Sequence, residues 1–232
     1  TLVVKKSNFN GSHPNGFFED NEYERFVRLV VKEGDDKLRD SNLGTSDYAK
    51  YDTATSNSTA YDAKGLLSSS IDDSNPVLFF EHKALYRSVK DEVPESQYNI
   101  EIGKLKIVKK GKDLSIITYG LGVIWAKEYA KNSNYDIEIV DLRTLIPMDV
   151  EGVLASVSKT NRVLILHEDN ITGGIGAEIS ALISENLFES LDAPIIRLGS
   201  LDTPIPFSKN IENDIYFPVN KIHDRVNKLM KY

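Results

Sequence analysis

The chain has 232 residues, of which 41% are hydrophobic, and this is enough for one large or two small cores. Its formal net charge of -7 argues against nucleic-acid binding, because no basic stripe is present to neutralise phosphates. The absence of cysteine excludes disulfides, thiolate nucleophiles and cysteine-based zinc sites, and no apolar run approaches the roughly 20 residues of a membrane span.

The first 60 residues are rich in Asn, Ser, Asp, Lys and Gly. Within them only Glu22–Glu33 has a convincing core-forming pattern, which predicts either a helix or a strand through Phe26–Lys32. Residues 34–58 contain too few large apolar side chains to bury themselves. As a folded element, this part of the chain makes little sense alone.

From residue 59 onward the pattern is regular. A helix is predicted over Tyr61–Ile71, then a buried strand over Pro76–Glu81, a polar connector, and a β segment over Lys104–Lys109. Strands then follow at Leu114–Tyr119, Ile137–Asp141, Arg162–His167 and Pro194–Leu198, and helices at Val123–Lys131, Asp149–Lys159, Gly176–Leu187 and Val219–Met230. Continuous apolar strands alternating with helices indicate an α/β fold, with a mostly parallel twisted sheet covered by helices on both faces.

Several ordered segments carry a more specific signal. They are NPVLFFEHKALYR (75–87), VDLRTLIPMDVEGVLASVSKTNRVLILHE (140–168), TGGIGAEIS (172–180) and SLDAPIIRLGSLDTPIPF (190–207). Together they resemble the β subunit, or β half of a fused chain, of the decarboxylating component of thiamine-diphosphate-dependent 2-oxo acid dehydrogenases. EHKALYR, the EVP and YNI motifs of 92–100, the His167–Glu168 pair and the terminal Tyr232 favour the branched-chain 2-oxoisovalerate type. A pyruvate or acetoin enzyme, another thiamine enzyme of the transketolase group, and a non-enzymatic partner-binding scaffold remain alternatives.

The resemblance implies three parts. Residues 1–87 would be an incomplete or gapped pyrimidine-binding-type domain, of which only 59–87 are recognisable. Residues 88–103 would be a linker, and 104–232 a domain like the carboxyl-terminal domain of transketolase. The complete enzyme would decarboxylate a branched-chain 2-oxo acid and reductively acylate a lipoyl group. Thiamine diphosphate and Mg would be bound mostly outside this segment, so we assign no catalytic and no cofactor-binding residue.

The resemblance also implies partners: an α subunit or α half, a second β copy, and the subunit-binding domain of the dihydrolipoyl acyltransferase. Asp192 and Tyr232 match positions that meet the acyltransferase domain in such complexes. Their alternative roles are a solvated turn residue and a frayed terminus. No nucleic acid and no membrane partner is expected, and the compartment would be the bacterial cytoplasm or the mitochondrial matrix.

The turn SIDDSN (70–75) combines carboxylate and amide side chains, which serve first as capping and turn residues. Hard cations prefer these oxygen ligands together with backbone carbonyls. The resemblance implies a structural potassium ion here, held by the Ser70 carbonyl, Asp73 and Asn75, with the remaining ligands outside the recognisable segment.

Other conspicuous residues are interpreted as structural. TGGIGAEI lacks the spacing of a phosphate loop and predicts a tight strand-to-helix turn. His167 and Glu168 are adjacent on a strand, so they point to opposite faces and form no direct dyad. The Asp202–Thr203 pair predicts a rigid turn, and Asp141–Arg143 a local ion pair. Four scattered histidines give no zinc-ligand set.

Overall fold

The computed structural model describes residues 2–3, 28–30, 53–56, 58–83, 85–213 and 217–232. Contacts divide the chain into two compact units. The first unit comprises Thr1–Lys104 and Arg143–Met148, and the second comprises Leu105–Leu142 and Asp149–Tyr232. The short segment Arg143–Met148 thus lies with the first unit, although its sequence position falls inside the expected 104–232 domain.

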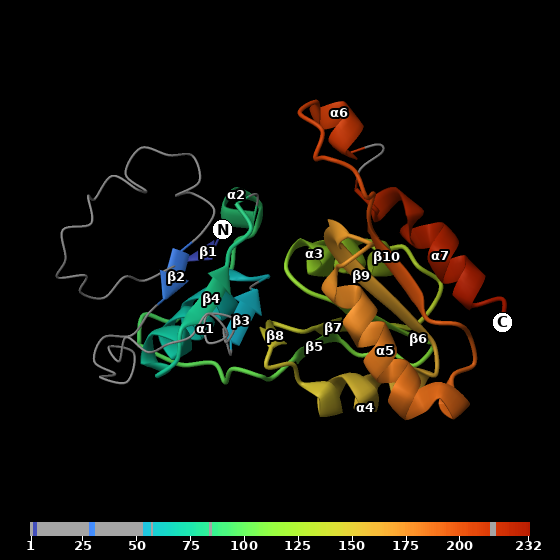
Figure 1. Ribbon diagram of the computed structural model, residues 1–232, viewed down its shortest axis with the longest axis horizontal. Helices are drawn as coiled ribbons and strands as arrows, with labels where there is room; N and C mark the ends of the chain where they lie inside the picture. The colour runs from blue at the N-terminus through green and yellow to red at the C-terminus, as the bar shows by residue number, and fades with distance from the viewer. Residues whose placement is uncertain (1, 4–27, 31–52, 57, 84, 214–216) are drawn as a thin grey trace, which may run out of the picture. The chain divides into compact units, whose positions relative to one another are not determined.

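The second unit is built on a five-stranded sheet with the order β10-β9-β6-β7-β5 (Figure 1). The strands are β5 Lys106–Lys109, β6 Leu114–Thr118, β7 Ile137–Asp141, β9 Val163–Asn170 and β10 Ile196–Ser200. Neighbouring strands run parallel except β5, which lies antiparallel to β7 at one edge. The predicted mostly parallel sheet is confirmed.

Helices cover both faces of this sheet, as predicted. They are α3 Leu121–Lys131, α4 Val150–Thr160, α5 Ile175–Leu187 and α7 Ile222–Leu229. Leu114 and Ile116 of β6 share one core cluster with residues of α3 and α7. Ser115 points to the other face, where its Oγ lies 2.8 Å from Ser156 Oγ of α4. All five residues of β6 are buried, and three of them, Leu114, Ile116 and Ile117, are large apolar residues of the core.

The order in which the chain adds strands to the sheet reverses beside β6. It runs from β6 through α3 to β7 on one side, and returns through α4 to β9 on the other side. The amino ends of α3 and α5 are capped by Gly120 and Gly174, which provide no side-chain hydrogen bond. In open α/β sheets such a reversal brings functional groups to the carboxyl ends of the strands.

The first unit contains helix α1 (Ala60–Asp72) and a second sheet with the order β1-β4-β3-β8, in which β2 also pairs with β4. The strands are β1 Leu2–Val3, β2 Arg28–Val30, β3 Thr53–Ser56, β4 Val77–Phe80 and β8 Thr144–Ile146. Thr59 caps α1, because its Oγ1 accepts a 3.0 Å hydrogen bond from the Asp62 amide. Leu66 and Phe79 belong to its buried core.

Two short strands differ in how far the sequence predicts them. Within Glu22–Glu33 only Arg28–Val30 is described, and it forms a strand antiparallel to β4, which agrees with the strand alternative there. Most of residues 1–58 lies outside the described residues. The sequence did not predict β8, because three residues after Arg143 (φ 56) are too few to show a periodic pattern.

The remaining elements are short. They are α2 Leu85–Ser88, α6 Lys209–Ile211, and the 3₁₀ turns Phe188–Ser190 and Val219–Lys221. None of the helices in the described ranges is both long enough and apolar enough to cross a membrane.

Candidate functional sites

The turn between α1 and β4 brings Ser70, Asp73 and Asn75 into one local arrangement. Asp73 Oδ1 accepts hydrogen bonds from the Asn75 backbone amide at 2.8 Å and from Asn75 Nδ2 at 3.2 Å. Ser70 is 1% exposed, and its hydroxyl donates to the Leu66 carbonyl at 2.7 Å. The capping and turn role expected for this segment is therefore visible in the structure.

The same turn offers the donor types that a hard cation prefers. The last carbonyls of a helix, here including that of Ser70, have no amide partner within the helix. Asp73 adds a carboxylate and Asn75 an amide oxygen. Groups of three or more His, Cys, Asp or Glu side chains suited to a metal do not occur among the described residues. The donor chemistry of the turn fits potassium better than zinc.

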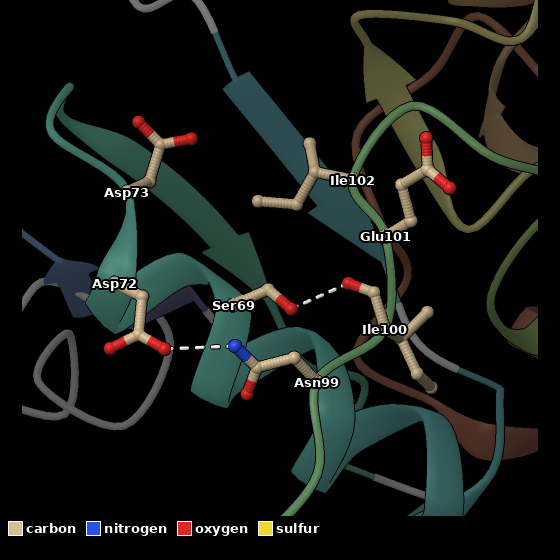
Figure 2. Close-up of a pocket in the computed structure, with 7 residues that line it drawn as sticks. All are labelled: Ser69, Asp72, Asp73, Asn99, Ile100, Glu101 and Ile102. Atoms are coloured by element: carbon tan, nitrogen blue, oxygen red, sulfur yellow. Dashed lines mark hydrogen bonds between the residues drawn. The ribbon is translucent and has the colours of Figure 1, made fainter.

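A hollow of about 470 Å³ lies beside this turn (Figure 2). Its lining consists of Ser69, Asp72, Asp73, Asn99, Ile100, Glu101 and Ile102. Two side-chain hydrogen bonds hold the 99–102 segment against α1: Asn99 Nδ2 donates to Asp72 Oδ2 at 2.8 Å, and Ser69 Oγ donates to the Ile100 carbonyl at 2.5 Å. No local sequence pattern predicts this wall, because its residues belong to a polar connector about 30 positions later in the chain.

His167 lies near the carboxyl end of β9 and is fully buried. Its Nδ1 lies 2.9 Å from the Asp169 carbonyl oxygen, and its ring is stacked on Tyr119 with centroids 6.4 Å apart. Burial lowers the pKa of His167, and burial together with the nearby Asp169 carboxylate raises that of Tyr119. His167 is thus a neutral, packed residue, which supports the structural interpretation.

The glycine-rich turn after β9 approaches this ring closely. A Cβ atom at Gly174 would lie 3.0 Å from His167 Cε1, and one at Gly176 would lie 2.5 Å from His167 Nε2. Gly173 has φ +76, a conformation that favours glycine. The turn therefore uses glycine for close packing and for its backbone path, as the sequence predicted.

Asp202 joins the loops that follow β9 and β10. Its Oδ2 accepts a 2.6 Å hydrogen bond from Thr172 Oγ1, and its Oδ1 accepts a 3.0 Å bond from the Thr172 amide. These two bonds lower the pKa of Asp202 below its ordinary value. The Asp202–Thr203 turn, which follows β10, is therefore hydrogen-bonded to the loop that follows β9.

Residues 103–222, just over half of the chain, match the profile of one family, described as "Transketolase, C-terminal domain". The chain belongs to the transketolase C-terminal domain family. A solved structure, "Split gene transketolase, inactive beta4 tetramer", is similar with a TM-score of 0.62, covering 77% of this chain and 57% of that chain. Its 22% sequence identity supports the fold alone.

Curated relatives are considerably more similar in sequence. "Pyruvate dehydrogenase E1 component subunit beta" of Porphyra purpurea is 45% identical over 176 residues, which are 75% of this chain and 53% of that protein. "2-oxoisovalerate dehydrogenase subunit beta" of Bacillus subtilis is 44% identical over 178 residues, with the same coverage. The chain spans about half the length of these curated relatives. The pyruvate and 2-oxoisovalerate proteins are equally similar, so the branched-chain assignment is not distinguished.

Within the transketolase C-terminal domain, the turn before β10 holds Asp192. Arg162 Nη1 lies 3.0 Å from Asp192 Oδ2, and the Asp192 amide donates to the Asn161 carbonyl at 2.9 Å. The Asp192 side chain is 47% exposed. Asp192 is therefore not simply a solvated residue, because Asn161 and Arg162, which follow α4, hold its backbone and its carboxylate.

The other expected docking residue, Tyr232, is exposed after α7, and its amide donates to the Leu229 carbonyl at 3.4 Å. Ala193 shares a core cluster with Leu229 and Met230. The turn that follows Asp192 and the end of α7 thus meet in one core.

Proposed function

We propose that this chain is part of the decarboxylating component of a thiamine-diphosphate-dependent 2-oxo acid dehydrogenase, and that it serves subunit assembly and acyltransferase docking. The observation that carries this proposal is the 44–45% identity to β subunits of such dehydrogenases over three quarters of the chain. Because only about half of those proteins is represented, the chain alone is expected to be inactive.

The proposed substrate is a branched-chain 2-oxo acid, on the basis of the EHKALYR segment, the EVP and YNI motifs and the terminal Tyr232. Pyruvate is the alternative. The assay is reductive acylation of a lipoyl domain by the chain assembled with its α partner. Faster turnover of 2-oxoisovalerate than of pyruvate supports the proposal, and the reverse order assigns the pyruvate type. No turnover of either substrate by an assembled complex would favour the scaffold alternative.

Thiamine diphosphate would supply carbanion chemistry to the complete enzyme. Gly174 and Gly176, which follow β9, pack closely against His167 and are not assigned to the diphosphate. The cofactor is proposed to be held mostly by other segments. The role proposed for this chain is therefore to orient and join subunits, without a residue that touches the reacting atoms.

Exposed apolar side chains on the segment after β10 support an assembly role. Ile205 is 68% exposed, and Phe207 is fully exposed. Asp202 anchors the start of this segment through Thr172. Apolar groups displayed on an anchored segment are typical of surfaces that another chain covers. We assign this segment to contact with the α partner or with a second copy of the chain.

The Asp192 turn is proposed to bind a basic side chain of the acyltransferase's subunit-binding domain. Electrostatic pairing of this kind contributes to specificity and to the association rate. Asp192→Asn should weaken capture of that domain and reduce the salt dependence of binding. Asp224→Asn removes an acidic residue from exposed positions of α7 and serves as the control. Equal binding by both variants and by the unmodified chain would count against this assignment.

A further inference from the structure

Three glycines surround the His167 ring. Gly174 and Gly176 come from the turn that opens α5, and Gly199 comes from β10. A Cβ atom at Gly199 would lie 2.6 Å from His167 Cε1, and one at Gly176 would lie 2.5 Å from Nε2. Contacts under 3.0 Å are essentially not seen for real Cβ atoms. The imidazole thus occupies a space that only glycine leaves open.

The hydrogen bonding of His167 specifies its tautomer. The Asp169 carbonyl oxygen can only accept, so Nδ1, 2.9 Å away, must carry the proton and donate it. The lone pair of the neutral ring is then on Nε2. That nitrogen is buried and has no hydrogen-bond partner among the described residues. It lies against Gly176 in the first turn of α5, at the partially positive end of that helix.

The charged and titratable neighbours do not compensate for a proton on Nε2. Tyr119, which directly follows β6, is stacked on the ring, and burial raises its pKa, so it stays neutral. Asp169 favours the imidazolium, whereas Arg197 of β10 opposes it. The further acidic residues nearby in sequence are Glu168 on β9 and Glu178 in the first turn of α5. Burial is the largest influence, and it lowers the pKa of His167.

We propose that His167 is an acid-release latch, which holds the glycine-rich turn 172–176 and the loop after β10 only while its ring is neutral. A second proton on the ring has no acceptor in the closed arrangement. The ring must then move away from Gly174, Gly176 and Gly199, or the turn must open so that water reaches Nε2.

Opening would reach beyond the turn itself. The Ile171 amide donates to the Ser200 carbonyl at 3.2 Å, and Asn170 Nδ2 donates to the Leu201 carbonyl at 2.9 Å. Thr172 holds Asp202 by two further bonds. Movement of the turn therefore loosens the start of the loop that displays Phe207. Acidification would weaken the ordering of that exposed apolar segment.

The direction of the pH effect follows from linkage. The unfolded chain binds a proton at the ordinary histidine pKa of about 6.5, whereas the closed structure resists protonation. The stabilisation that the neutral His167 ring contributes to the closed turn is fully present above that pH. It decreases as the pH falls below about 6.5, until the pH reaches the lowered pKa of the closed state.

Hydrogen exchange of the full chain tests this proposal. Protection factors, corrected for the intrinsic pH dependence of exchange, are compared at about pH 7.5 and about pH 5. Amides of residues 171–177 and 200–203 should lose protection by about tenfold or more, while those of β6 should not. His167→Asn keeps an N–H donor near Asp169 and cannot titrate, so this loss should disappear. His223→Asn changes an exposed histidine, which pairs with Asn227, and should leave the loss unchanged.

The outcomes are decisive in both directions. Equal protection at both pH values in the unmodified chain would overturn the proposal, as would an identical loss in His167→Asn. If that variant does not fold, nitrogen NMR of the histidines in the unmodified chain replaces it. The Nδ1–H tautomer at neutral pH, and titration of His167 together with the loss of protection, support the latch. Titration without any change in exchange refutes it.

Discussion

Arg143 and Asp62 are 81 positions apart in the chain, yet Arg143 Nη2 lies 2.6 Å from Asp62 Oδ1. The Asp62 side chain is fully buried, and that of Arg143 is 13% exposed. Thr59 Oγ1 also donates to Asp62 Oδ2 at 2.7 Å, so the carboxylate joins the start of α1 to the residue before β8. A pairing first expected to be local to Asp141–Arg143 thus involves a distant helix.

Arg143→Met should destabilise the first unit by about 3–5 kcal/mol, because it leaves a buried carboxylate without its counter-charge. Urea unfolding followed by a probe of that unit measures the change. Lys131→Met is the control, because Lys131 and Glu128 form an exposed pair that is expected to contribute less than about 1 kcal/mol. Similar losses in both variants would show that the buried pair has no special importance.

Glu138 lies in β7, is 1% exposed, and accepts a 2.6 Å hydrogen bond from Ser156 Oγ. Its Oε2 also contacts Lys159 Nζ. Glu138→Gln removes the charge that these donors meet, and should lower the free energy of unfolding of the second unit by about 1–3 kcal/mol. Glu128→Gln, at an exposed position of α3, should be nearly neutral. Thermal unfolding of the two variants compares them directly, and equal midpoints would contradict the prediction.

Gly176→Ala should destabilise the second unit by about 1–3 kcal/mol, because its methyl group would overlap the His167 ring. Gly173→Ala is the matched control: nothing lies within 4 Å of its Cβ position, and only its φ of +76 opposes alanine. Adding His167→Ala should rescue part of the Gly176→Ala loss and none of the Gly173→Ala loss. Denaturant unfolding of the two glycine variants, the two double variants and His167→Ala alone gives this coupling.

Asp202 should titrate below the ordinary aspartate pKa, because two hydrogen bonds from Thr172 favour its charged form. The contact contributes stability above the unfolded-state pKa, and this contribution is lost as the pH falls through the lowered folded-state value. Carboxyl carbon NMR measures the titration. Thr172→Val removes the hydroxyl donor and should raise the pKa toward its ordinary value, whereas Thr203→Val should not.

Potassium should stabilise the first unit if the α1–β4 turn holds the ion that the family resemblance implies. At ten times its dissociation constant, an ion that binds only the folded state adds about 1.4 kcal/mol. Thermal unfolding in potassium chloride is compared with sodium chloride at equal ionic strength. Asp73→Asn should remove the difference, and Glu101→Gln, in the adjacent hollow, should keep it. An equal thermal unfolding midpoint in the two salts would contradict a potassium site at this turn.

The sheet of the second unit was predictable because its strands are buried on both faces. β6 has three large apolar residues among its five, β9 begins with four apolar residues in succession, and the helices between the strands show an amphipathic pattern. The sites were less accessible to sequence reasoning. The partner of Arg143 and the wall formed by Asn99–Ile102 depend on residues about 30 to 80 positions away, for which no local pattern exists.

The close packing around His167 was partly predictable. The glycines of the turn indicated a close backbone approach, but not which side chain approached. Gly199 shows the difficulty, because nothing in the β10 sequence connects it with a ring on β9. Such contacts arise from the register of parallel strands, in which Leu198 lies beside Leu166.

The antiparallel strand β5 limits how the sheet of the second unit can grow. Its register with β7 shifts between Ile107 and Lys109, and Lys109 Nζ donates to Asp136 Oδ1 at 3.2 Å and to the Ile137 carbonyl at 3.0 Å. Irregular, lysine-bearing edge strands are poor templates for pairing with another chain. Edge-to-edge addition of a further strand at β5 is therefore disfavoured, so strand pairing of this sheet with another chain would have to use the opposite edge, β10.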